Sequence, residues 1–277
     1  MTQDKSTDRR YPMKLRFSGG KVEKVGLDLY DGATSFYGFS QAIQIAFHAY
    51  LTGEIVSRAT ALRGAEMYFS APRRGSVLFD IVAVVEKYPA SIGVSAPIVY
   101  DFIKIAFSRA IGLLNSKPET PAIQKLALDE TFFDQLAETL EGSLQRAHRA
   151  IDHGVPRVSL ERPRSELVVF DQRSSQWVNT REENPEVEEF TGNITRYNSI
   201  SGNGRAFIRG LDRILPFRPG ERFPENKRGF LSWSLHGNTT SGKKELRFWA
   251  SRIESASGEA KRLILADVAE AEPRQAG

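Results

Sequence analysis

Residues 192–208 read GNITRYNSISGNGRAFI, and this stretch decides the architecture that we predict for the second half of the chain. Two short segments flank the turn Gly202-Asn203-Gly204, a pattern typical of a β-hairpin. Comparable short segments surround it, broken by turns that contain glycine or proline, at residues 167–170, 229–235, 245–253 and 263–268. Five or six short strands within roughly 110 residues indicate a small β-barrel.

The predicted barrel is the basic part of the chain. Between Phe190 and Arg262 there are 14 lysines and arginines against 6 acidic residues, whereas the whole chain has a net charge of +4. Five glutamates lie just before or at the start of this region, between Glu182 and Glu189. Segregated charge of this kind can attract an anionic partner, or the acidic segment can fold back and neutralise the basic one.

The hairpin at residues 192–208 resembles the opening hairpin of cold-shock proteins and related oligonucleotide-binding barrels. In such barrels, aromatic side chains stack on bases and basic side chains hold phosphates. The resemblance implies contact with single-stranded DNA or RNA through basic and aromatic residues of the barrel. Our candidates are Arg196, Tyr197, Arg205, Phe207, Arg209, Trp233, Lys243, Lys244 and Arg247. Phe207 can serve this function or can fill the barrel core.

The first half of the chain predicts an antiparallel sheet with helices, in the order ββαββαα. Gly19-Gly20 separates two strand-like segments, which predicts a hairpin. We expect strands at residues 14–17, 22–30, 65–71 and 76–85, and helices at 36–50, 98–112 and 129–153. The fold class is therefore α+β, with a disordered leader at 1–12, an α+β domain at 13–156, a β-barrel at 157–268 and a flexible tail at 269–277.

Three further segments resemble a family of uncharacterised bacterial proteins. They are Leu27–Asp31, His48–Glu54 and Pro72–Ser76. Proteins of this family pair an N-terminal α/β domain of unknown function with a C-terminal five-stranded β-barrel. The resemblance implies the fold and no particular reaction.

The composition excludes several kinds of site. The chain has no cysteine, so disulfides, thiolate metal sites and cysteine nucleophiles are excluded. It shows neither a signal peptide nor a run of about 18 apolar residues, so we expect a soluble cytoplasmic protein without a membrane partner. No phosphate-binding loop or catalytic motif occurs, and we expect neither a cofactor nor a metal. His148 and His153 lie near a predicted helix end, where we expect them to be solvated.

Three hypotheses of function follow. The first is a non-enzymatic binding or adaptor protein whose barrel contacts nucleic acid or another anionic partner, with Arg73 and Arg74 as a further anion- or partner-contacting pair. The second is a protein–protein interaction subunit, or a homo-oligomer, in a multi-component bacterial system such as anti-phage defence. The third is an enzyme whose site gathers Asp28, Asp31, His48 and Glu54 at one end of the sheet.

Overall fold

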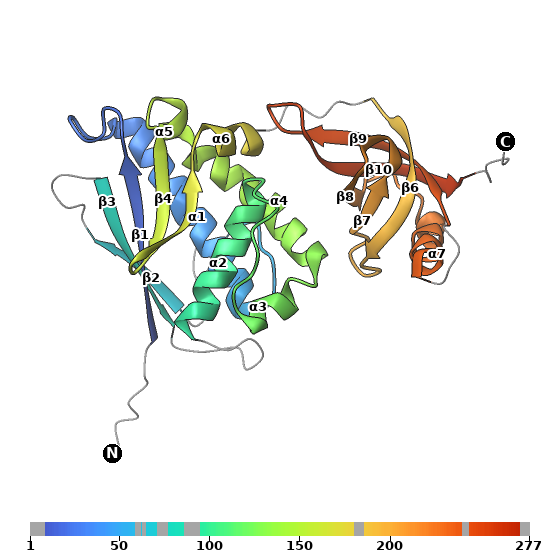
Figure 1. Cartoon of the computed structure of the whole chain (residues 1–277), viewed down its shortest axis with the longest axis horizontal. Coiled ribbons are helices and arrows are strands. Elements are labelled where there is room, and N and C mark those ends of the chain that lie inside the picture. The colour runs from blue at the N-terminus through green and yellow to red at the C-terminus, as the bar shows by residue number, and fades with distance from the viewer. Residues whose placement is uncertain are drawn as a thin grey trace, which may run out of the picture. The chain divides into compact units, whose positions relative to one another are not determined.

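The computed structural model describes residues 9–58, 62, 65–70, 77–85, 95–179, 186–239 and 244–271. It divides into two compact units, Met1–Val178 and Asn179–Gly277 (Figure 1). The first unit contains a five-stranded antiparallel sheet with helices and the second contains a closed five-stranded barrel, which confirms the predicted fold class. Of the helices in the described ranges, none is both long enough and apolar enough to cross a bilayer.

The sheet of the first unit has the strand order β2-β3-β1-β4-β5. Its strands are β1 (Arg9–Ser18), β2 (Ala65–Ser70), β3 (Val77–Val85), β4 (Arg157–Arg162) and β5 (Ser165–Phe170). β1 is central because it pairs with β3 and β4, and every second side chain from Tyr11 to Phe17 is buried, at no more than 2 % exposure. Its first residues lie in the range that we predicted to be a disordered leader, so that leader cannot extend beyond residue 8.

Helices cover one face of this sheet (Figure 1). They are α1 (Leu29–Thr52), α2 (Ala96–Ala110), α3 (Pro121–Leu126), α4 (Glu130–Ala147), α5 (Arg149–Asp152) and α6 (Gln172–Val178). α1 packs against α4 and α2, and their apolar side chains form one core with the buried face of the sheet. α3 lies between two predicted helices, where we predicted none, and the helix that we predicted at 129–153 is divided at His148 into α4 and α5.

The predicted hairpin at Gly19-Gly20 is wrong, because residues 22–30 form a turn and the start of α1 instead of a strand. Both edges of β1 are already paired, with β3 on one side and β4 on the other. The Asp28 carboxylate accepts the backbone N–H groups of Tyr30 and Asp31, which starts the helix there. Gly53 ends α1 in the left-handed conformation that glycine favours.

The boundary between the units also lies later than predicted. We placed it at residue 156, but β4 and β5 extend the first sheet and α6 follows them within the same unit. β4 pairs with β1 from Arg157 to Glu161, so these residues cannot belong to the barrel. The second unit therefore starts at Asn179.

The barrel of the second unit closes in the order β10-β8-β7-β6-β9. Its strands are β6 (Glu188–Tyr197), β7 (Gly204–Ile208), β8 (Arg213–Pro219), β9 (Leu246–Glu254) and β10 (Ala260–Glu270). β8 and β10 run parallel, whereas all other neighbouring pairs are antiparallel. Two short 3-10 turns, η1 (Arg209–Leu211) and η2 (Glu225–Lys227), flank β8.

One helix, α7 (Arg228–Thr239), connects η2 to β9 and packs against β6. We predicted a strand at 229–235, and the structure has this helix instead, because a short apolar run fits either structure. Leu231 is buried in the barrel core. The hydroxyl of Ser234 accepts the N–H of Ile194 at 3.1 Å and donates to the carbonyl of Lys244 at 2.7 Å. These two hydrogen bonds therefore hold α7 both to β6 and to the residues just before β9.

Candidate nucleic-acid interface

The outer side of β7 and β8 forms the candidate interface. Ala206 and Ile208 of β7 are buried at 1 % and 0 % exposure, so the alternate residues Arg205 and Phe207 point outwards. In the ladder with β8, Arg205 lies opposite Pro216 and Phe207 lies opposite Ile214, which is 45 % exposed. We call the outward residues Arg205, Phe207, Ile214, Pro216 and Arg218 the β7–β8 face. Phe207 therefore does not fill the barrel core, which was one of the two alternatives for this residue, because its ring lies outside that core.

The neighbouring strand β6 extends this face. Asn193 lies opposite Phe207, and Arg196 lies opposite Arg205 after a bulge in the ladder. The two strands therefore place two arginines at facing positions on the outer side of the barrel. The strand segments 191–197, 204–208 and 213–219 contain four arginines and no acidic residue. These segments therefore combine apolar and cationic groups without acidic residues, whereas the two glutamates of β6, Glu188 and Glu189, lie at its first residues, beside β9.

A well-ordered loop, residues 198–203, joins β6 to β7. The Asn198 side chain accepts the N–H groups of Ile200 and Ser201, and the Asn198 backbone exchanges bonds with Gly202 and Asn203. These bonds hold the loop closed while Ile200 remains 92 % exposed. The loop thus presents an apolar side chain at the end of the hairpin formed by β6 and β7, and β7 carries Phe207.

Four other predicted barrel residues do not join this face. Tyr197 and Trp233 pack against the barrel core, and burial raises the pKa of the Tyr197 hydroxyl. The Lys244 ammonium group lies 4.8 Å from the centre of the Trp233 ring, which is a cation–π contact. Arg209 forms an ion pair with Glu245.

Arg247, on β9, points outwards over Trp249, with 5.3 Å between its guanidinium carbon and the ring centre. In the strand ladders, Trp249 lies between Glu189 of β6 and Asp267 of β10. We call Glu189, Arg247, Trp249 and Asp267 the β9 side. Of the predicted set, the structure therefore brings only Arg196, Arg205 and Phe207 together. Lys243, Arg73 and Arg74 lie outside the described residues.

The acidic segment before the barrel is described from Glu186 onwards. Glu188 is part of β6 and pairs with Arg252 of β9, with 3.0 Å between Oε1 and Nε. This contact neutralises a cation of β9, so a residue of the acidic segment does fold onto the basic barrel. The attraction of an anionic partner stays a prediction.

The sequence analysis missed Ile214, Pro216 and Arg218 because it did not predict β8. Two prolines in seven residues argue against a strand, since proline has no N–H for the ladder. The two-residue spacing of the apolar residues Leu215 and Phe217, both buried in the structure, was the available signal. β7 and β8 are the second and third strands of this closed barrel, and the corresponding strands carry the binding face in oligonucleotide-binding barrels.

The proposed Asp/His/Glu site does not form. Asp28 and Asp31 lie at the beginning of α1, whereas His48 lies in its last turns and Glu54 just after its end. A rise of about 1.5 Å per residue separates Asp31 from His48 by roughly 25 Å. His48 contacts the backbone carbonyl of Glu54 and the hydroxyl of Thr52 instead. Asp31 pairs with Arg149 and His153, each at 2.7 Å.

His148 is buried and not solvated as predicted. Its Nδ1 lies 2.7 Å from the carbonyl of Leu144, and its Nε2 lies 2.7 Å from the hydroxyl of Ser174. Burial lowers its pKa, which favours the neutral ring. His148 is 0 % and Ser174 is 4 % exposed, so this pair has no access to a substrate and joins the end of α4 to α6 as a structural contact.

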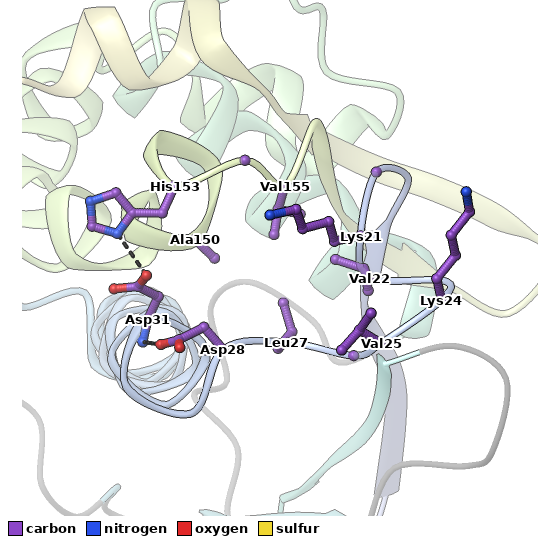
Figure 2. Close-up of a pocket in the computed structure, with 14 residues that line it drawn as sticks. Lys21, Val22, Lys24, Val25, Leu27, Asp28, Asp31, Ala150, His153 and Val155 are labelled. Atoms are coloured by element: carbon purple, nitrogen blue, oxygen red, sulfur yellow. Dashed lines mark hydrogen bonds and ion pairs between the residues drawn. The ribbon is translucent and has the colours of Figure 1, made fainter.

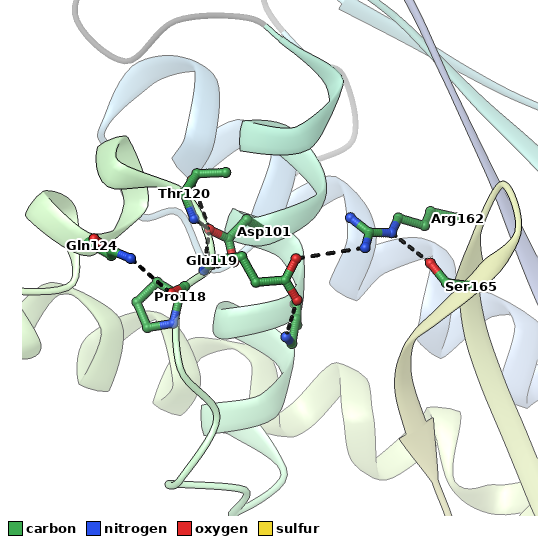
Figure 3. Close-up of polar contacts among 8 residues, drawn as sticks. Asp101, Pro118, Glu119, Thr120, Gln124, Arg162 and Ser165 are labelled. Carbon is green, nitrogen blue, oxygen red and sulfur yellow. Dashed lines mark hydrogen bonds and ion pairs between the residues drawn. The ribbon is translucent and has the colours of Figure 1, made fainter.

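A second buried polar group, Asp101 on α2, is also structural (Figure 3). Its carboxylate is 1 % exposed and accepts the N–H groups of Glu119 and Thr120 as well as the Thr120 hydroxyl. These bonds fix the chain where α3 begins. Glu119 pairs in turn with Lys104 at 2.6 Å, and the hydrogen bond from Lys104 lowers the pKa of Glu119. Within the described ranges, no three His, Asp or Glu side chains gather as metal ligands.

Comparison with known protein families finds a match for part of the first unit. Residues 13–117 match a domain of unknown function, DUF7946. The match spans the region from β1 to α2 and contains the three segments on which the resemblance to an uncharacterised family rests. It confirms that resemblance and names no activity. Comparison with curated proteins and with solved structures finds no match.

Proposed function

We propose that the chain is a non-enzymatic binding or adaptor protein whose barrel binds single-stranded nucleic acid on the β7–β8 face. The observation that carries the proposal is the outward position of Phe207 and Ile214 among Arg196, Arg205 and Arg218. Aromatic rings stack on bases of any sequence, and guanidinium groups contact the phosphates between them. The expected ligand is therefore a flexible single strand whose bases can reach the ring of Phe207.

Duplex DNA fits this surface less well. Its bases are stacked inside the helix, so Phe207 and Ile214 would find no base to contact. A single strand exposes its bases and lets each make contact in turn. We therefore expect binding of single strands in preference to duplexes, with little dependence on sequence.

Fluorescence anisotropy of a labelled single-stranded oligonucleotide, titrated with the full chain, tests the proposal. Three arginine–phosphate contacts predict that the logarithm of the binding constant falls with the logarithm of the salt concentration with a slope of about −2. Binding should weaken steeply between about 50 mM and 200 mM salt. Absence of binding at about 50 mM salt would falsify the proposal.

A second candidate, a protein–protein interaction subunit, is favoured by the edge strand β2. Tyr68 and Phe69 of this strand are 57 % and 64 % exposed. Phe69 lies 5.0 Å from the ring of Phe36, beside a groove of about 200 Å³. Edge strands with exposed apolar residues can pair with a strand of another chain. Light scattering tests this candidate, since a monomer that co-purifies with no partner argues against it.

A further inference from the structure

The first unit contains a cavity of about 820 Å³ that is separate from the barrel (Figure 2). Residues 20–28, the first turn of α1 and the chain after α5 form its walls. Pockets of roughly 300–1,000 Å³ are of the size that encloses a small organic molecule. The cavity is therefore large enough for a ligand with a ring or a short chain.

One part of its wall is apolar. Val22, Leu27, Ala150 and Val155 line it, and Figure 2 shows their side chains around the central space. The backbone bends around this space at Gly26 and Gly154, whose φ angles of 106° and 101° are disfavoured for other residues. An apolar wall favours a ligand that has an apolar body, because burying that body removes it from water.

The carboxylates at the cavity are already compensated. Asp28 accepts two backbone N–H groups at 2.9 Å, and Asp31 pairs with the Arg149 guanidinium and the His153 ring. Burial acts to raise the pKa of Asp31, but hydrogen bonds from His153 and Arg149 outweigh it, so the pKa lies below the ordinary aspartate value. Neither acid therefore attracts a cationic ligand strongly.

The lysines at the cavity are not compensated in this way. Neither Lys21 nor Lys24 forms an ion pair with any described residue. Figure 2 shows the ammonium group of Lys21 extended over the cavity towards Val155, while Lys24 points away at the rim. A free ammonium group above an apolar wall matches an anionic group attached to an apolar body.

We propose that this cavity binds a small organic anion, a phosphate or a carboxylate on an apolar or aromatic body, with Lys21 as the principal anion contact. The apolar body lies against Val22, Leu27 and Val155. The cavity belongs to the first unit and not to the barrel, so its test does not depend on the outcome of the nucleic-acid proposal.

Isothermal titration calorimetry on the full chain tests the proposal with phenyl phosphate, benzoate and inorganic phosphate. Saturable binding of phenyl phosphate or benzoate, tighter than that of inorganic phosphate, is the expected result, and the two organic probes distinguish a phosphate from a carboxylate ligand. Lys21→Gln should weaken the binding about tenfold, the usual effect of losing a hydrogen bond to a charged group. Lys125→Gln removes the same charge from an exposed position on α3 and should leave the binding unchanged.

A filling variant, Leu27→Trp, gives a second measurement and should abolish binding while the melting temperature shows that the chain is folded. Equal binding by wild type and Lys21→Gln would overturn the proposal. So would the absence of saturable binding for both organic probes, or inorganic phosphate binding as tightly as both of them. Lys21→Gln decides the question even where Leu27→Trp does not fold.

Discussion

The β7–β8 face and the β9 side of the barrel each combine arginine with an aromatic side chain, but their surroundings differ. On the β9 side, Arg247 covers Trp249, and the strands on either side place Glu189 and Asp267 opposite that ring. On the β7–β8 face, Phe207 lies among arginines, in strand segments without acidic residues. Basic and aromatic composition therefore does not identify a binding face. What distinguishes the two sides is whether acidic residues lie at the strand positions beside the aromatic ring.

The largest expected effect is on the barrel that carries both sides. A Cβ on Gly192 would overlap the carbonyl oxygen of Phe207, so Gly192→Ala should force β6 and β7 apart. We expect a loss of about 1–3 kcal/mol in the free energy of unfolding, measured by urea denaturation. Gly210→Ala is the control, because open space surrounds that position and the change should stay within about 0.5 kcal/mol. Equal unfolding midpoints for the two variants would contradict the close approach of the strands.

The next effect separates the two aromatic residues. Phe207→Ala should weaken single-strand binding by about 1–3 kcal/mol, the contribution of one base stacked on an aromatic ring. Trp249→Ala removes a larger ring from the β9 side and should change the dissociation constant by less than about twofold, because its acidic neighbours repel phosphates. Anisotropy titrations of both variants at one salt concentration make the comparison. A greater loss for Trp249→Ala would reverse our assignment of the two sides.

A smaller effect separates the two arginines. Arg205→Gln should reduce the steepness of the salt dependence by about 0.7, the share of one phosphate contact on a single strand. Arg247→Gln removes the same charge from the β9 side and should leave the slope unchanged. The measurement is the binding constant at four or more salt concentrations for each variant. Parallel lines for Arg205→Gln and wild type would show that Arg205 does not contact phosphate.

The smallest effect comes from removing the acids of the β9 side. The double variant Glu189→Gln/Asp267→Asn should strengthen binding by less than about 1 kcal/mol, because it makes that side more positive at an exposed surface. The gain should disappear at high salt, where exposed charges are screened. A strengthening that persists at high salt would point to a change in packing and not in charge.

Much of the fold follows from local patterns in the sequence. β2, β3, β6, β7, β9 and β10 were predicted from short strand-like segments and turn residues, and α2 and most of α1 from the helical spacing of apolar residues. The errors fall in segments whose sequence pattern fits both a strand and a helix. They also fall where the pairing with a distant strand determines the structure. Residues 229–235 are too short an apolar run to distinguish a strand from a helix. Residues 22–30 alternate like a strand, but β3 and β4 occupy both edges of β1.

The candidate site was predictable in part for the same reason. Arg205 and Phe207 come from a hairpin whose pattern is local, and the pairing with β8 shows which way Phe207 points. The partners of the other cations lie far along the chain, as Glu188 does for Arg252. No local sequence pattern indicates such an ion pair between distant residues. Counting lysines and arginines in the sequence therefore overstated how many of them are available to a ligand.

Ser234 connects three parts of the barrel, since its hydroxyl bonds to β6 and to the start of β9 from its place in α7. The Ile194 N–H of β6 donates to that hydroxyl at 3.1 Å. Its exchange with deuterated solvent should therefore respond to the separation of α7 from β6. The exchange rate of this single amide thus measures how often this end of the barrel opens.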